Sequence, residues 1–121
     1  MRAITETEPL DDALLVLWTT AERETALNMI FMYTTNARRH GWWPQVTLLV
    51  WGAATRALCE DESLRQALAE AQRAGVIVIA CRRCAELTGV VDELKALGVK
   101  VFYTGEYLTE WLKSGKRLLS V

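Results

Sequence analysis

Two cysteines separated by two residues are the side chains best suited to covalent chemistry. Cys81 and Cys84 enclose the sequence Cys-Arg-Arg-Cys, and Cys81 directly follows an apolar run at residues 76–80. The thiolate is the nucleophilic form of cysteine, and a helix N-terminus or a basic neighbour favours it. We therefore expect Cys81 to be the catalytic nucleophile, with Cys84, Arg82 and Arg83 in supporting positions.

The Cys-x-x-Cys spacing leaves other interpretations open. A zinc site needs two more soft ligands, and only Cys59 and His40, on separate predicted helices, remain. We therefore expect no metal. A thioredoxin-type dithiol normally follows the first strand of its fold and faces a cis-proline, and neither Pro9 nor Pro44 is placed to supply one. A dithiol redox pair and a simple buried Cys81 both stay open as alternatives.

Alternating strand and helix patterns indicate the scaffold that positions these thiols. Apolar, β-branched runs predict strands at residues 13–18, 46–51, 76–80, 99–103 and 117–121. Helical periodicity predicts helices at residues 21–39, 53–59, 62–74, 82–87, 91–97 and 106–114. Thr19 and Glu22 have the spacing of a capping box at the first helix. Right-handed crossovers then predict one α/β domain, residues 1–121, with a five-stranded, mainly parallel sheet and helices on both faces.

The carboxyl ends of the predicted strands give an address for a functional site. Ligands of such sheets bind at this edge, near the point where the chain changes faces. The residues expected to form the pocket around Cys81 are Trp18, Thr19, Thr20, Trp51, Gly52 and Tyr103. The three aromatic side chains in this set are expected to wall the pocket.

Composition argues against several classes of partner. The net charge is -1, with 14 basic and 15 acidic residues, so no broad positive field favours direct nucleic-acid binding. No apolar run approaches the ~20 residues that cross a bilayer. Residues 1–12 carry four acidic side chains, unlike a secretory signal, and we expect a cytoplasmic protein. The sequence has no glycine-rich phosphate loop, so we expect no nucleotide or flavin cofactor.

The first long predicted helix is apolar nearly all round at residues 27–33. Such a helix is buried on more than one side. With Trp42 and Trp43 nearby, this segment predicts a homo-oligomer, a trimer or a small multiple of chains.

The chain resembles the DsrE/DsrF-like sulfur-transfer proteins over nearly its whole length. The resemblance rests on residues 17–19 (Leu-Trp-Thr), 26–29 (Ala-Leu-Asn-Met), 50–52 (Val-Trp-Gly), 80–85 (Ala-Cys-Arg-Arg-Cys-Ala) and 89–90 (Gly-Val). The cysteine after the third strand, with Gly-Val eight residues on, is its most specific part. This family has a flavodoxin-like three-layer fold and forms oligomers.

The resemblance implies sulfur trafficking, with sulfane sulfur carried as a persulfide on Cys81. It also implies sulfur-donor and sulfur-acceptor proteins as partners. Cys84 lies outside the pattern of the family's tRNA-thiolation relays, so a thiol-disulfide redox protein remains an alternative. A non-catalytic oligomeric binding module is another, because some members lack the cysteine. Whether the chain is a carrier or a sulfurtransferase with turnover is left open.

Overall fold

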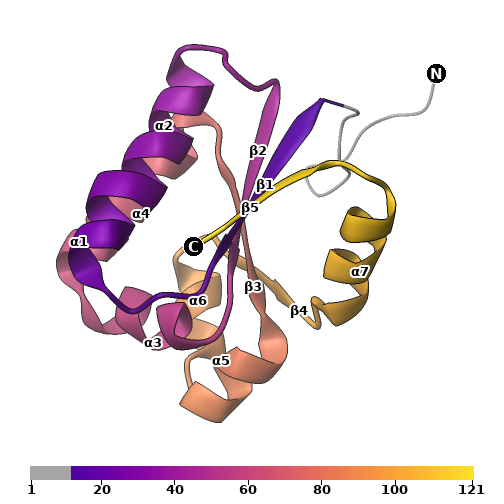
Figure 1. Ribbon diagram of the computed structural model, residues 1–121. Helices are drawn as coiled ribbons and strands as arrows, with labels where there is room; N and C mark the ends of the chain where they lie inside the picture. The colour runs from indigo at the N-terminus through magenta and orange to yellow at the C-terminus, as the bar shows by residue number, and fades with distance from the viewer. Residues whose placement is uncertain (1–11) are drawn as a thin grey trace.

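Five parallel strands form one sheet in the order β4-β3-β2-β1-β5 (Figure 1). The computed structural model describes residues 12–121. The strands are β1 (Ala13–Trp18), β2 (Gln45–Val50), β3 (Ile77–Cys81), β4 (Lys100–Phe102) and β5 (Arg117–Ser120). The predicted α/β fold is confirmed, and each strand boundary lies within one residue of its prediction.

The helices divide unequally between the two faces of the sheet. From β1 to β4 each crossover moves one strand toward the same edge, and right-handed connections therefore place these helices on one face. The last crossover returns from β4 to β5 beside β1, so α7 (Gly105–Lys113) covers the opposite face (Figure 1). The first face carries α1 (Arg23–Thr25), η1 (Ala26–Phe31), α2 (Met32–Arg39), α3 (Ala53–Glu60), α4 (Glu62–Ala74), α5 (Arg82–Thr88) and α6 (Val91–Ala96).

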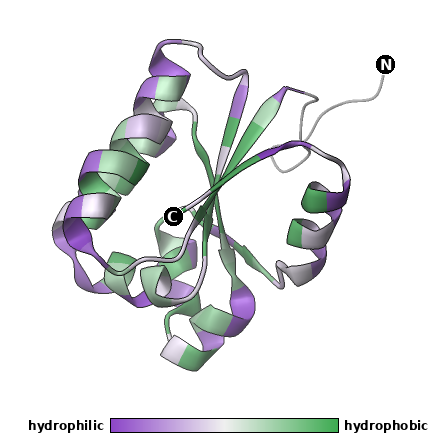
Figure 2. Ribbon diagram, in the orientation of Figure 1, coloured by the Kyte–Doolittle hydropathy of each residue, from purple (hydrophilic) through white to green (hydrophobic). Residues whose placement is uncertain are grey.

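A core lies on each side of the sheet. Most of the strand residues have apolar colours in Figure 2. Strand β2 is buried at all six of its positions, including the polar residues Gln45 and Thr47. Alternation along β1 divides its side chains between the two cores. Leu14 and Val16 pack toward the larger group of helices, whereas Ala13 and Leu15 pack toward Trp111 of α7.

The first long helix begins later than predicted and contains a π-helical turn. Glu22 is its N-cap and accepts hydrogen bonds from the backbone N–H groups of Glu24 and Thr25, so the predicted capping box with Thr19 is wrong. The wider π turn, η1, follows directly. It contains the buried residues Ala26, Ile30 and Phe31.

Candidate active site

Cys81 lies at the switch point of the sheet. It is the last residue of β3 and the N-cap of α5, and it pairs in register with Phe102 at the end of β4. Strand β3 leads into α5 on one face, and its neighbour β4 leads into α7 on the other. Divergent connections leave space at the carboxyl ends of two adjacent strands, where ligands of α/β sheets bind.

The surroundings of Cys81 favour its thiolate. Burial raises the pKa of this thiol, but four neighbouring donor groups together hold the pKa below its ordinary value. The donors are the Cys84 backbone N–H, the Thr104 hydroxyl, the Cys84 thiol and the Arg83 backbone N–H. Two of them are N–H groups in the first turn of α5, which have no partner within the helix. The fold therefore supplies the charge stabilisation that a nucleophilic cysteine needs.

Cys84 complements Cys81 as a thiol donor. Burial raises the pKa of Cys84, and the hydrogen bond to Cys81 and its negative charge raise it further, against the lowering effect of the Gly52 N–H. That N–H lies 3.4 Å from the Cys84 Sγ. Gly52 has φ 63° and ψ −137°, a conformation essentially confined to glycine, and it is this conformation that holds the N–H in place. Of the two thiols, Cys81 is therefore the one that ionises at the lower pH.

Thr104 belongs to the site, although it is not among the pocket residues expected from the sequence. It follows β4, is the N-cap of α7 and is fully buried. Within residues 12–121 no group, the Cys81 sulfur included, meets hydrogen-bond geometry with its buried hydroxyl, but the hydroxyl is near enough to Cys81 to lower the pKa of that thiol. Its place one residue beyond Tyr103, at the same sheet edge as Cys81, is the signal that could have found it.

Replacing Thr104 with valine is expected to raise the pKa of Cys81. Valine keeps nearly the same shape but removes the hydroxyl, so the Cys81 thiolate loses one of the neighbouring groups that lower its pKa. A pH titration of the ultraviolet thiolate absorbance measures the change. Thr109→Val, an exposed position on the same helix, is the matched control and should leave the titration where it is in the wild type. An unchanged Thr104→Val curve would show that the hydroxyl does not act on Cys81.

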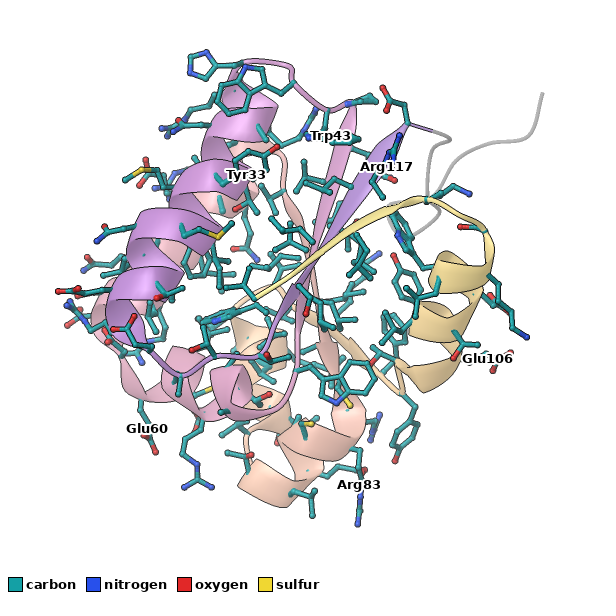
Figure 3. All side chains as sticks on the ribbon, in the orientation of Figure 1. Tyr33, Trp43, Glu60, Arg83, Glu106 and Arg117 are labelled. Atoms are coloured by element: carbon teal, nitrogen blue, oxygen red, sulfur yellow. The ribbon has the colours of Figure 1, made fainter. Side chains whose placement is uncertain are left out.

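The two arginines act differently from their expected role. The Arg82 guanidinium pairs with Glu86 at 3.4 Å and lies over the Tyr103 ring, 5.9 Å from its centroid. The Tyr103 hydroxyl donates to both Glu86 carboxylate oxygens, at 2.9 and 3.1 Å, and this bond raises the pKa of Tyr103. Arg83 extends away from the sheet (Figure 3), and its contribution to Cys81 is the backbone N–H. Backbone N–H groups and the side chains of Thr104 and Cys84, rather than guanidinium charge, therefore lower the pKa of Cys81.

Several expected pocket residues lie elsewhere. Trp18 is fully buried, its ring edge-on to Phe31 at 5.2 Å and its Nε1 donating to the Thr20 carbonyl at 2.8 Å. It is therefore part of the core and does not wall an open pocket. The Thr19 backbone N–H and hydroxyl both donate to the Val121 carbonyl, and the Thr20 hydroxyl accepts from the Glu22 N–H.

The structure brings together part of the predicted set. Cys84 and Gly52 contact each other beside Cys81. Trp51 is half-buried and packs with the core under α7, and Tyr103 stays exposed on the rim. Cys81 itself is 4% exposed, so its sulfur lies beneath the surface rather than in an open cleft.

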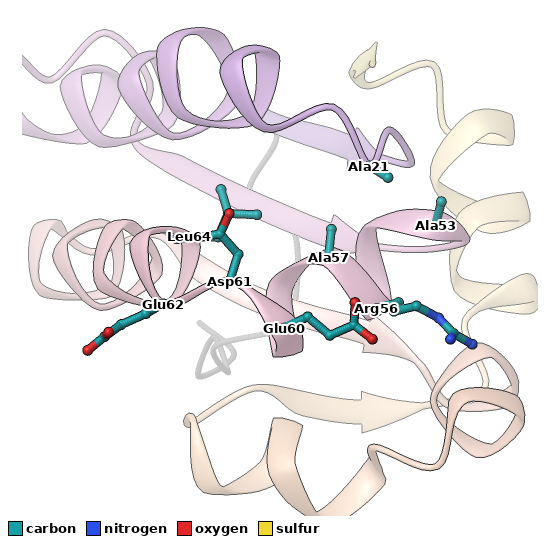
Figure 4. Close-up of a pocket in the computed structure, with 8 residues that line it drawn as sticks. All are labelled: Ala21, Ala53, Arg56, Ala57, Glu60, Asp61, Glu62 and Leu64. Atoms are coloured by element: carbon teal, nitrogen blue, oxygen red, sulfur yellow. Dashed lines mark hydrogen bonds between the residues drawn. The ribbon is translucent and has the colours of Figure 1, made fainter.

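A groove whose lining includes neither thiol lies between the start of the first helix, α3 and α4 (Figure 4). It has a volume of about 520 Å³ and is lined by Ala21, Ala53, Arg56, Ala57, Glu60, Asp61, Glu62 and Leu64. Asp61 caps α4 and pairs with Arg23 at 2.9 Å, which gives it a structural role.

Within residues 12–121, no group of three or more His, Cys, Asp or Glu side chains is placed to hold a metal ion. Over the same range, no helix has the length and apolar character needed to cross a bilayer.

Comparison with solved structures places this fold among known proteins. A conserved protein of unknown function from Bacteroides thetaiotaomicron is 36% identical, with a TM-score of 0.89 over 91% of this chain and 95% of that one. This chain belongs to the same family. The ychN protein from E. coli is 17% identical, with a TM-score of 0.68 over 93% of this chain and 100% of that one, and the likeness shows a shared fold. No family model and no curated protein matches the sequence.

Proposed function

We propose that the protein is a cytoplasmic sulfur-trafficking protein that carries sulfane sulfur as a persulfide on Cys81. The observation that carries this proposal is the position of Cys81 at the switch point of the sheet and the start of α5, where neighbouring polar groups lower the pKa of its thiol. The resemblance of the chain to DsrE/DsrF-like proteins supports the same assignment, because it implies that Cys81 corresponds to their sulfur-carrying cysteine. The partners would be a sulfur-donor protein and a sulfur-acceptor protein.

The transfer step needs only a thiolate and a persulfide. The Cys81 thiolate attacks the outer sulfur of a donor persulfide, R–S–SH, and forms a new S–S bond. The original S–S bond breaks, and the donor leaves as the thiolate R–S⁻. Cys81 then holds the outer sulfur as Cys–S–SH. An acceptor thiolate removes that sulfur by the same chemistry, which regenerates the Cys81 thiolate.

A second candidate function is a thiol-disulfide redox protein. The hydrogen bond between the Cys84 thiol and Cys81 favours it, because the two sulfurs are already neighbours. The two functions differ in what they require of Cys84. A carrier accepts sulfur on Cys81 without Cys84, whereas a dithiol redox protein cannot work without it.

Loading of the Cys84→Ser protein tests the proposal. After incubation with an inorganic polysulfide donor, its intact mass is expected to rise by one sulfur atom. Serine preserves an acceptor for the Gly52 N–H, so the site should keep its shape. Adding Cys81→Ser should abolish the gain, whereas adding Cys59→Ser should not, because that thiol lies on α3 with a pKa raised to about 11. Sulfur retained on another residue in the protein that lacks Cys81 would rule out the carrier function as stated.

We also propose that a second copy of the chain covers the outer face of the first helix. This face forms a groove lined by Asn28, Met29, Met32, Tyr33, Asn36 and Trp42. Met32 and Trp42 are 53% and 56% exposed, and none of the six carries a charge. Two identical faces can therefore meet without like-charge repulsion.

The oligomer is expected to dissociate when Met32 is replaced by glutamate. Like charges would then face each other in an interface that would also have to desolvate them. Light scattering at micromolar concentration should report an oligomer for the wild type and a monomer for Met32→Glu. Glu24→Gln, an exposed change on the same long helix, is the control. A monomeric wild type would contradict the proposal.

A further inference from the structure

The two thiols of α5 are arranged for reaction with each other as well as with a donor. Cys81 is the N-cap of this helix and Cys84 is three residues on, so both belong to its first turn. Residues three apart on a helix lie on the same face, one above the other. The Cys84 thiol hydrogen-bonds to the Cys81 sulfur, and the Gly52 N–H contacts the Cys84 Sγ from the other side at 3.4 Å.

We propose that Cys84 resolves the persulfide on Cys81, releasing the outer sulfur as hydrosulfide and leaving a Cys81–Cys84 disulfide. This inference rests on the proposed function, since it begins from the loaded carrier. It gives the protein a second activity, the reductive release of sulfane sulfur when no acceptor takes it.

The step balances within the protein. The Cys84 sulfur attacks the Cys81 Sγ, the inner sulfur, and the bond from Sγ to the outer sulfur breaks. The outer sulfur takes the electron pair of that bond and leaves as HS⁻. Two electrons from the thiol pair reduce the sulfane sulfur, and the pair is oxidised to the disulfide. When the persulfide is ionised, the proton of Cys84 is the one that hydrosulfide carries away. Return to the starting state requires a dithiol reductant.

Loading removes one obstacle to attack by Cys84. In the empty protein the negative charge on the Cys81 Sγ is among the causes that raise the pKa of Cys84. A persulfide carries its charge on the outer sulfur, one bond further away, so the inner sulfur becomes an electrophile. The Gly52 N–H then remains to stabilise negative charge on the Cys84 sulfur, since this contact lowers the pKa of Cys84. Cys59 lies on α3, and neither Cys81 nor Cys84 is among the groups that shift the pKa of its thiol.

A time course of loading tests the inference. Wild-type protein, reduced and freed of reductant, is mixed with inorganic polysulfide, acid-quenched at intervals and weighed intact, and released hydrosulfide is assayed in parallel. The wild type should first gain one sulfur and then convert to a disulfide, with one hydrosulfide released per chain. In Cys84→Ser the sulfur gain should persist without this release. Cys59→Ser should behave as the wild type does.

Three other outcomes would each overturn the inference. A wild-type persulfide that lasts as long as that of Cys84→Ser would mean that Cys84 does not attack it. A disulfide that forms without a preceding sulfur gain would assign the pair to direct dithiol oxidation. If Cys84→Ser gains no sulfur at all, the carrier function itself fails, and the release step fails with it. The first outcome leaves the carrier function standing, so the two proposals are distinguished.

Discussion

Replacing Cys81 with serine is expected to abolish the thiolate absorbance that the wild-type protein develops below the pH at which a free cysteine ionises, about 8.5. Hydrogen bonds outweigh burial at Cys81 and hold its pKa below the ordinary value, so its thiolate persists as the pH falls and disappears only at that lower pKa. The other two thiols do not compensate. The pKa of Cys59 is raised to about 11, and that of Cys84 is raised as well.

A titration of ultraviolet absorbance suits this measurement because it requires no reagent to reach a buried sulfur. Cys59→Ser is the control and should keep the low transition intact, losing only absorbance at high pH. Cys84→Ala should shift the low transition upward, because it removes both the thiol donor and the neighbouring sulfur from Cys81. A wild-type curve whose first transition falls at or above the ordinary value would refute the assigned thiolate.

Replacing Trp18 with alanine is expected to destabilise the fold by about 3–5 kcal/mol, the usual cost of truncating a buried aromatic side chain. Trp18 is fully buried, packs edge-on against Phe31, and its Nε1 donates to the Thr20 carbonyl. Domains of this size are stable by only about 5–15 kcal/mol, so such a loss is a large share of the total.

Urea unfolding followed by circular dichroism measures this loss as a lower midpoint at unchanged slope. Leu112→Ala is the control, since Leu112 on α7 is 57% exposed and should change stability by less than about 0.5 kcal/mol. A small effect of Trp18→Ala on stability together with a large effect on sulfur loading would restore the original prediction that this side chain walls the pocket.

The strands could be predicted from the sequence because burial on both faces leaves a simple signature. The run at residues 13–18 has no charged side chain, and β1 occupies those residues. The π-helical turn could not be predicted, because η1 changes the period that the prediction assumes.

The site was predicted in part for a similar reason. Residue order places Cys81 at the end of a strand, but it does not say which face of a doubly buried strand a side chain such as Trp18 occupies. Neighbours in sequence are also not always neighbours in space. Arg82 follows Cys81, yet its charge is compensated by Glu86. Thr104 lies twenty-three positions after Cys81 in the sequence. It is nevertheless close to the Cys81 sulfur because β3 and β4 are paired.

Within residues 12–121, α7 is the one helix on its face of the sheet, and this has a kinetic consequence for Cys81 at the neighbouring strand end. Thr104 is the N-cap of α7, and Phe102 packs against Tyr107 of that helix with ring centroids 5.8 Å apart. Cys81 is 4% exposed, so a donor reaches its sulfur only after neighbouring residues move, and we expect the start of α7 to be the segment that moves. Local opening of a peripheral helix requires less free energy than unfolding of the whole domain. At high donor concentration the loading rate should therefore reach a plateau set by the opening of α7, and amide hydrogen exchange in that helix should proceed at the same rate.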